Sequence, residues 1–168
     1  LMVSGRRGFQ KVYDLPERVL PANVDTREPS PEAYARYLVR QSLDANGFAS
    51  VANMTYLRRS PGLQTTVAGV LEAMTSSGAL TRFTLDATDT GKLAPGAHFY
   101  ARPEILDRRT PAAPARAKVL SPFDNVLIQR QRSQNLFGFD YQLECYLPAH
   151  KRRYGYFCLP LLYRDGFI

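Results

Sequence analysis

Residues 63–74 constrain the fold more than any other part of this chain, because their apolar side chains recur at helical spacing. The apolar positions fall at i, i+4, i+7, i+8 and i+11, and they are Leu63, Val67, Val70, Leu71 and Met74. This is one face of a helix with 3.6 residues per turn. The spacing predicts a helix with one buried face, so other elements must pack against that face.

Two further helices are predicted before it, at residues 31–45 and 50–58. Pro31 suits the first position of a helix, and Gly47 suits the position just beyond its end. The first of these helices has an apolar stripe of Tyr34, Tyr37 and Leu38. The second has apolar residues three apart, which are Val51, Met54 and Leu57. Three consecutive helices are therefore predicted between residues 31 and 74.

Strands are predicted on both sides of these helices. Residues 80–85 and 97–101 alternate like the two strands of a hairpin, with residues 86–96 as a flexible polar tip. Short helices followed by a β-hairpin is the element order of a winged helix. Residues 1–15 form a second predicted hairpin, in which two apolar strands flank a basic turn bounded by glycine. We expect it to be the wing of a preceding winged helix, and both ends of the chain to be cut from something longer.

The last third of the chain is rich in aromatic and β-branched residues, which favour strands. Strands are expected at 119–120, 141–147 and 154–162, with the tyrosines from Tyr141 to Tyr163 in the core, Tyr154 excepted, and a helix at 129–136. The predicted fold is α+β, a winged helix-turn-helix followed by part of an antiparallel β-barrel. The expected parts are a wing hairpin at 1–21, a winged helix at 22–102, a linker at 103–117 and the start of the barrel at 118–168.

Composition narrows the class of partner. The formal net charge is +7, and residues 116–168 carry eight basic and four acidic side chains. A basic surface suits a polyanion such as nucleic acid, although the charge could serve solubility alone. The two cysteines, Cys145 and Cys158, lie in apolar surroundings and predict a reducing cytoplasm without a disulfide. No run of about 18 apolar residues predicts a membrane span.

Several unusual short sequence motifs appear in the order typical of one family. They are RGFQKVYDL at 7–15, ERVLP at 17–21, LSPFD at 120–124, LFGFDY at 136–141, KRRYGYF at 151–157 and LPLL at 159–162. In these motifs the chain resembles the YcaQ/AlkZ-type winged-helix DNA glycosylases. The middle of the chain, about residues 30–115, is similar in its helix pattern only. The resemblance implies tandem winged helices, a C-terminal β-barrel, and removal of alkylated or crosslinked bases without a metal or other cofactor.

The catalytic signature implied by the resemblance is a Gln-x-Asp or Gln-x-Gln motif in the first winged helix. The only such string here is Gln129-Arg130-Gln131, which lies in another context and is not given that role. Members of the family often have Trp-Asp-Arg where this chain has Ile128-Gln129-Arg130. No catalytic residue is therefore assigned, and whether the chain is an enzyme by itself is left open.

Glycosylases hold the DNA backbone around a damaged base, so basic side chains beside aromatic ones are the candidates for contact. Lys151, Arg152 and Arg153, followed by Tyr154, form the best phosphate-binding candidate, the alternative being a solvated turn. Arg6 and Arg7 occupy the tip of the first hairpin, where wings often touch the backbone. Arg58 and Arg59 end a predicted helix, and capping explains them better than DNA contact.

Other polar residues receive structural interpretations. The third helix turns Gln64, Thr65, Ala68 and Glu72 outward and carries no Lys or Arg, which disfavours sequence-specific reading of a major groove. Asp124 suits a helix or turn cap better than catalysis. His98 and His150 have no metal-ligand spacing, so no metal site is predicted.

These observations predict the DNA-binding portion of a DNA-repair glycosylase, catalytically inactive alone, that binds double-stranded DNA with little sequence preference. The alternatives are a free-standing winged-helix module that binds DNA and a scaffold that contacts protein. An incomplete barrel would expose strand edges, so self-association through those edges is also expected.

Overall fold

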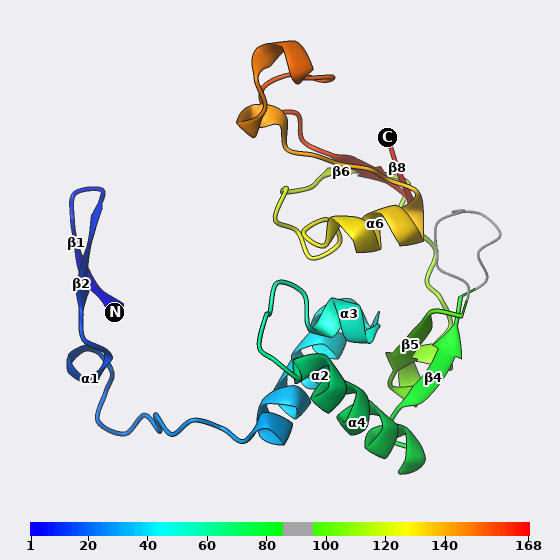
Figure 1. The fold of residues 1–168 in the computed structure, drawn as a ribbon. Helices are drawn as coiled ribbons and strands as arrows, with labels where there is room; N and C mark the ends of the chain where they lie inside the picture. The colour runs from blue at the N-terminus through cyan, green and yellow to red at the C-terminus, as the bar shows by residue number, and fades with distance from the viewer. Residues whose placement is uncertain (86–95) are drawn as a thin grey trace. The chain divides into compact units, whose positions relative to one another are not determined.

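The computed structural model describes residues 1–85 and 96–168 (Figure 1). The chain forms two compact units, Leu1–Ser30 and Pro31–Ile168. Helices and small antiparallel sheets occur together, which confirms the predicted α+β class. The predicted tip at residues 86–96 lies outside the described residues except for Gly96. Within the described ranges, no helix is long and apolar enough to cross a membrane.

The smaller unit is a β-hairpin followed by one helical turn. Strands β1 (Met2–Arg7) and β2 (Gln10–Asp14) pair antiparallel, and α1 (Pro16–Val19) follows. Gly8 begins the tight turn with φ of +58°, a left-handed conformation that costs glycine little. The predicted hairpin at residues 1–15 is confirmed, and its tip presents the basic residues to solvent.

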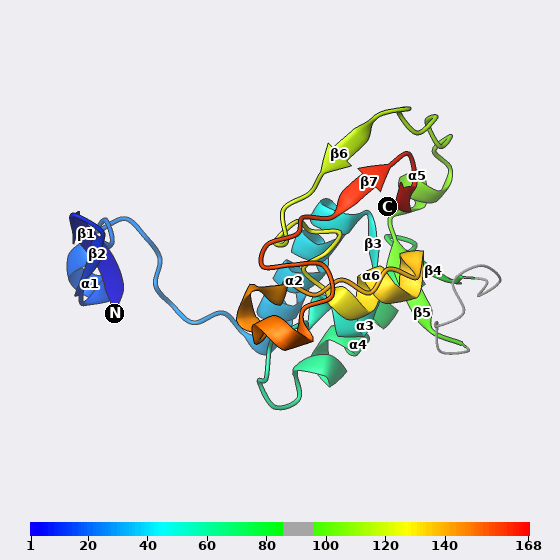
Figure 2. The same ribbon diagram turned by 90° about the horizontal axis from the view of Figure 1, so that it is seen from above.

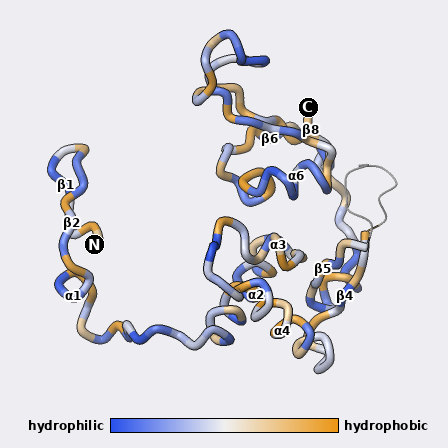
Figure 3. The backbone as a smooth tube through the Cα atoms, in the orientation of Figure 1, coloured by the Kyte–Doolittle hydropathy of each residue, from blue (hydrophilic) through white to orange (hydrophobic). Residues whose placement is uncertain are grey.

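The larger unit begins with three helices, α2 (Pro31–Asn46), α3 (Val51–Met54) and α4 (Leu63–Ser76). The predicted inner face of α4 is confirmed, because Leu63, Val67, Val70 and Leu71 are all buried. Across from them α2 buries apolar residues of its own, namely Ala35, Leu38, Val39 and Leu43. Figure 3 shows apolar residues along α4, whereas α6 is largely hydrophilic.

A three-stranded sheet closes this helical part. Strands β4 (Thr81–Thr84) and β5 (His98–Ala101) form the predicted hairpin. A two-residue strand, β3 (Phe48–Ala49), pairs with β5, giving the order β3-β5-β4. Strand β3 was not predicted, because two residues are too few to show an alternating pattern. Phe48 contacts the rings of Phe83 and Phe99 edge-on, at centroid distances of 5.8 and 5.6 Å.

The C-terminal segment contains short elements. After α5 (Pro103–Leu106) come β6 (Ala117–Val119), α6 (Arg130–Phe137), β7 (Leu161–Tyr163) and β8 (Gly166–Phe167). The strands form an antiparallel sheet in the order β6-β7-β8, and Figure 2 shows β6 and β7 side by side. No closed barrel occurs in the part of the chain that the structure describes.

The strand predicted at 141–147 is wrong, because these residues contain the 3₁₀ helix η1 (Glu144–Tyr146). The strand predicted at 154–162 is confirmed only at Leu161 and Leu162, which lie in β7, and residues 154–160 form no strand. The physical reason is that the side chain of Glu144 accepts the backbone N–H groups that a strand would offer to a neighbour. The prediction that these tyrosines lie in the core is wrong for Tyr146, Tyr156 and Tyr163, which are exposed.

Two details of the helices also differ from prediction. The helix expected at 50–58 ends at Met54, and Leu57 adopts φ of +59°, which no helix continues through. Tyr37, predicted in the apolar stripe of α2, is 46% exposed and stacks on Tyr34. The core takes Ala35 and Val39 instead, because these side chains lie on the same helical face as Leu38.

Candidate nucleic-acid interface

The tip of the β1–β2 hairpin gathers cations on a narrow ribbon. Arg6 lies directly opposite Lys11 in the register, and Arg7 lies opposite Gln10. Directly opposed side chains share a face of the ribbon, so the Arg6–Lys11 pair places two positive charges together. Like charges in this position destabilise a hairpin unless an anion lies between them. Among the described residues, no carboxylate forms an ion pair with these cations.

An aromatic side chain projects from the same tip. Phe9 occupies the second turn position and is completely exposed, at 102% of its reference area. In the sequence Phe9 stood out only as part of the RGFQKVYDL motif, with no predicted role. The signal that could have found it is an aromatic residue inside a two-residue turn, where no core is within reach.

The basic turn, defined here as Lys151–Gly155, is built around the buried carboxylate of Glu144. One oxygen accepts the backbone N–H of Arg153 at 2.8 Å, and the other accepts those of Tyr154 and Gly155 at 2.8 and 3.0 Å. Glu144 is only 7% exposed. These bonds hold its pKa below the ordinary glutamate value, the bonds from Arg153 and Tyr154 contributing most. The carboxylate therefore fixes the path of the backbone through the basic turn.

Arg152 has a different place from its neighbours. Its Nε donates to the carbonyls of Leu147 at 2.9 Å and Glu144 at 3.2 Å. Its guanidinium also lies over the ring of Tyr156, 5.0 Å from the centroid. These contacts commit much of the side chain to holding the turn together.

The side chains on either side of Arg152 remain accessible. Lys151 ends the 3₁₀ helix η2 (Ala149–Lys151) and is exposed, as is Arg153. Arg153 stacks on Tyr154 at 4.9 Å, and Tyr154 is 64% exposed. A cavity of about 300 Å³ lies beside this pair. The four predicted residues are thus brought together, with one facing inward and three facing solvent.

A comparison over the whole chain gives its family. The family model described as DNA glycosylase AlkZ-like matches residues 1–168. The chain belongs to the AlkZ-like DNA glycosylase family. No solved structure matches it. Membership relates this AlkZ-like chain to DNA repair and to DNA as the substrate of the family's reaction.

The remaining polar residues of the AlkZ-like chain fall into structural positions. The Asp124 carboxylate accepts the backbone N–H of Val126 at 2.9 Å and so caps a turn. The Gln129 side chain accepts from the Asn53 side-chain amide at 3.0 Å and donates to the Asn53 backbone carbonyl at 3.2 Å. Arg58 and Arg59 follow Leu57, beyond the end of α3, so the prediction that they end a helix is wrong.

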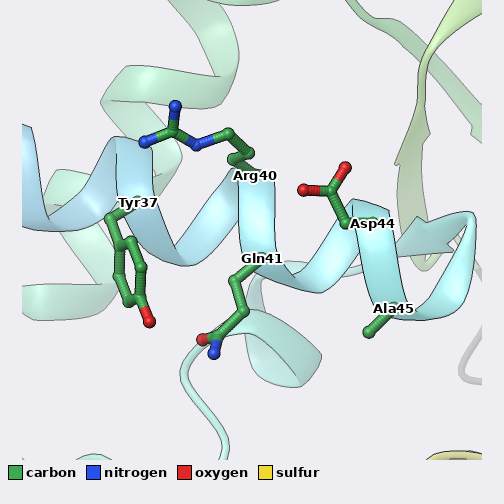
Figure 4. A pocket seen from close by; sticks show the side chains of 5 residues that line it. All are labelled: Tyr37, Arg40, Gln41, Asp44 and Ala45. Atoms are coloured by element: carbon green, nitrogen blue, oxygen red, sulfur yellow. The ribbon is translucent and has the colours of Figure 1, made fainter.

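Two other observations complete the survey. Within residues 1–85 and 96–168, no three His, Cys, Asp or Glu side chains cluster to hold a metal ion, and both cysteines are free. A shallow hollow lies along one face of α2, lined by Tyr37, Arg40, Gln41, Asp44 and Ala45 (Figure 4). A single helix supplies this lining, and Asp44 is paired with Arg102 at 2.6 Å. The hollow therefore lacks the opposing wall of a binding site.

Proposed function

We propose that this chain holds duplex DNA by its phosphate backbone, with little preference for sequence. The observation that carries the proposal is the basic turn, in which a buried carboxylate and Arg152 fix the backbone while Lys151 and Arg153 stay free. Basic side chains on a rigid support suit contact with phosphates, and the exposed ring of Tyr154 suits contact with a sugar or base.

The helical part is proposed to be a winged helix. The element order α2, β3, α3, α4, β4, β5 and the pairing of β3 with β5 support it. On this interpretation the chain comprises a wing hairpin at 1–21, a winged helix at 22–102, a linker at 103–117 and a barrel portion at 118–168. The hairpin would then be the wing of a preceding domain.

The exposed face of α4 supports weak sequence preference. Gln64, Thr65, Ala68 and Glu72 are all exposed, and α4 contains neither Lys nor Arg. Specific reading of a major groove relies chiefly on Arg and Lys to guanine and on Asn and Gln to adenine. A repair protein that meets lesions in any sequence has no need of such contacts.

The hairpin tip is the second proposed contact. Arg6, Arg7 and Lys11 would meet phosphates, which would relieve the repulsion between Arg6 and Lys11. Phe9 would lie against the minor groove, where apolar side chains insert between base steps and bend the duplex. The pairing of an exposed ring with flanking cations supports this assignment.

Catalysis is proposed to lie outside these residues. The only Gln-x-Gln string, Gln129-Arg130-Gln131, begins α6, and Gln129 is occupied by Asn53. The chain would then supply grip and DNA distortion, while the base is removed elsewhere in the enzyme.

The experiment is binding of the full chain to two labelled duplexes of unrelated sequence across a salt series. We expect equal affinity for both and a steep decrease with salt, with a slope of about −0.9 for each phosphate contact. Phe9→Ala should weaken binding without altering the slope, because it removes no charge. Absence of binding at low salt, or strong preference for one duplex, would refute the proposal.

A further inference from the structure

A buried arginine of α6, outside the basic turn, contacts α3. Arg132 is only 7% exposed, and its guanidinium lies over the ring of Phe48, 4.6 Å from the centroid. Burial lowers its pKa, and no nearby acid opposes that shift. Burying an unpaired charge costs free energy, so such a side chain normally has a counter-ion.

Among the described residues, the one hydrogen-bond acceptor of this guanidinium is neutral and shared. Nη1 of Arg132 donates to Oδ1 of Asn53 at 3.1 Å. The same oxygen also accepts from the backbone N–H and the hydroxyl of Ser50, both at 3.0 Å. A guanidinium has five N–H donors. Most of the donors of Arg132 therefore have no acceptor among the described residues.

These groups face a cavity with a composition that favours an anion. The cavity has a volume of about 270 Å³, whereas a water molecule occupies about 30 Å³ of liquid, so several waters or one oxyanion would fit. Its described lining supplies amides, a tyrosine hydroxyl and Arg132, but no carboxylate. The polar residues in that lining are Ser50, Asn53, Tyr56, Gln129, Gln131, Arg132 and Asn135.

The beginning of α6 adds to this preference. Gln129 at its N-cap position and Gln131 and Arg132 in its first turn all line the cavity. That turn contains no acidic residue, and no side chain caps it. The partial positive charge of a helix N-terminus thus adds to the charge of Arg132.

We propose that this cavity binds a phosphate-type oxyanion through Arg132. The guanidinium supplies charge-assisted hydrogen bonds to the phosphate oxygens through the donors that have no acceptor among the described residues. The oxyanion is either free phosphate or a phosphate of the DNA backbone, and the second source rests on the function proposed above. The site is distinct from the basic turn, because its cation is buried rather than exposed.

The first test measures the melting temperature of the full chain in inorganic phosphate against chloride at matched ionic strength. We expect a saturable, phosphate-specific rise that Arg132→Met abolishes. Arg130→Met is the matched control, because Arg130 is an exposed cation on the same helix, and it should keep the rise. An equal response to phosphate and chloride, or an unchanged response in Arg132→Met, would overturn the proposal.

A second variant covers the case in which Arg132→Met does not fold. Gln129→Glu places a carboxylate of the same shape beside the shared partner Asn53, where it competes as an internal counter-ion. It should fold and lose the phosphate response, and a retained response would overturn the proposal.

A DNA-binding series then identifies the source of the oxyanion. A slope reduced by about 0.9 in Gln129→Glu indicates a backbone phosphate in the cavity. An unchanged slope, with the phosphate response still lost, supports a free oxyanion. Failure of the wild-type chain to bind DNA refutes the proposed function alone, because the melting experiment contains no DNA.

Discussion

The helical part of the larger unit and its C-terminal segment are held together by different kinds of side chain. Between Ala35 and Tyr100 a single cluster of apolar residues fills the core. Within residues 117–168 the buried side chains include Arg132, Ser133 and Glu144 beside the apolar Leu127 and Leu143. Apolar packing leaves a periodic signal in the sequence, whereas a polar anchor is one residue that makes several specific bonds.

The aromatic residues follow the same division. The rings of Phe48, Phe83 and Phe99 pack on one another beside the helical core. In the C-terminal segment Tyr146, Tyr154 and Tyr156 are 81%, 64% and 65% exposed. The C-terminal segment stacks Phe139 on Phe167 as well, but it also presents Tyr154 and Tyr156 to solvent beside Arg153 and Arg152.

The largest expected effect comes from opening the apolar core. Leu71→Ala removes a side chain with 0% exposure, and it should lower the free energy of unfolding by about 2–5 kcal/mol. Urea unfolding measures the change. The adjacent Glu72→Ala, on the exposed face of α4, should change it by no more than about 0.5 kcal/mol. Similar losses in both variants would show that this core is not the main source of stability.

The next effect comes from the polar anchor. Glu144→Gln keeps the shape but removes the charge that accepts three backbone N–H groups. We expect a smaller loss of stability than in Leu71→Ala, and amide exchange at Tyr154 and Gly155 at least about 10-fold faster. Hydrogen-exchange mass spectrometry measures it. Unchanged exchange in this segment would mean that Glu144 does not hold the basic turn.

A dependence on pH separates the two regions further. The folded pKa of Glu144 is lowered, so its contribution to stability is present above the unfolded pKa of about 4.3 and is lost as pH falls through the folded value. The gap in urea midpoint between wild type and Glu144→Gln should therefore narrow as the pH falls below about 4.3. For Leu71→Ala the gap should persist. A constant gap for Glu144→Gln would contradict the assignment.

The same difference between the two regions explains which elements could be predicted from the sequence. The inner face of α4, the β4–β5 hairpin and the first hairpin were predictable, because each depends on local periodicity or turn chemistry. The strand expected at 141–147 was wrong and the one at 154–162 was right only in its last two residues, because Glu144 lies in a strand-like pattern yet accepts hydrogen bonds from backbone nine to eleven residues away. Charge clustering indicated the basic turn, but nothing in the sequence distinguishes Arg152 from Arg153.

A smaller effect distinguishes these two arginines. Arg152→Gln should lower the melting temperature by a few degrees, because it removes the bonds to the carbonyls of Glu144 and Leu147. Arg153→Gln should leave the melting temperature unchanged and weaken DNA binding instead. Differential scanning fluorimetry and fluorescence anisotropy measure the two properties. The reverse assignment of effects would contradict the geometry described here.

The central claim is that the basic turn contacts DNA. Its most direct test compares two double variants, each lacking two cations, in one DNA-binding titration. Lys151→Gln with Arg153→Gln removes the exposed cations of the basic turn, and Arg108→Gln with Arg109→Gln removes the same charge from an exposed segment after α5. The account predicts that the slope of log affinity against log salt falls by about 1.8 in the first variant and stays unchanged in the second. Equal slopes in the two variants would contradict it, because binding would then depend on net charge and not on the basic turn.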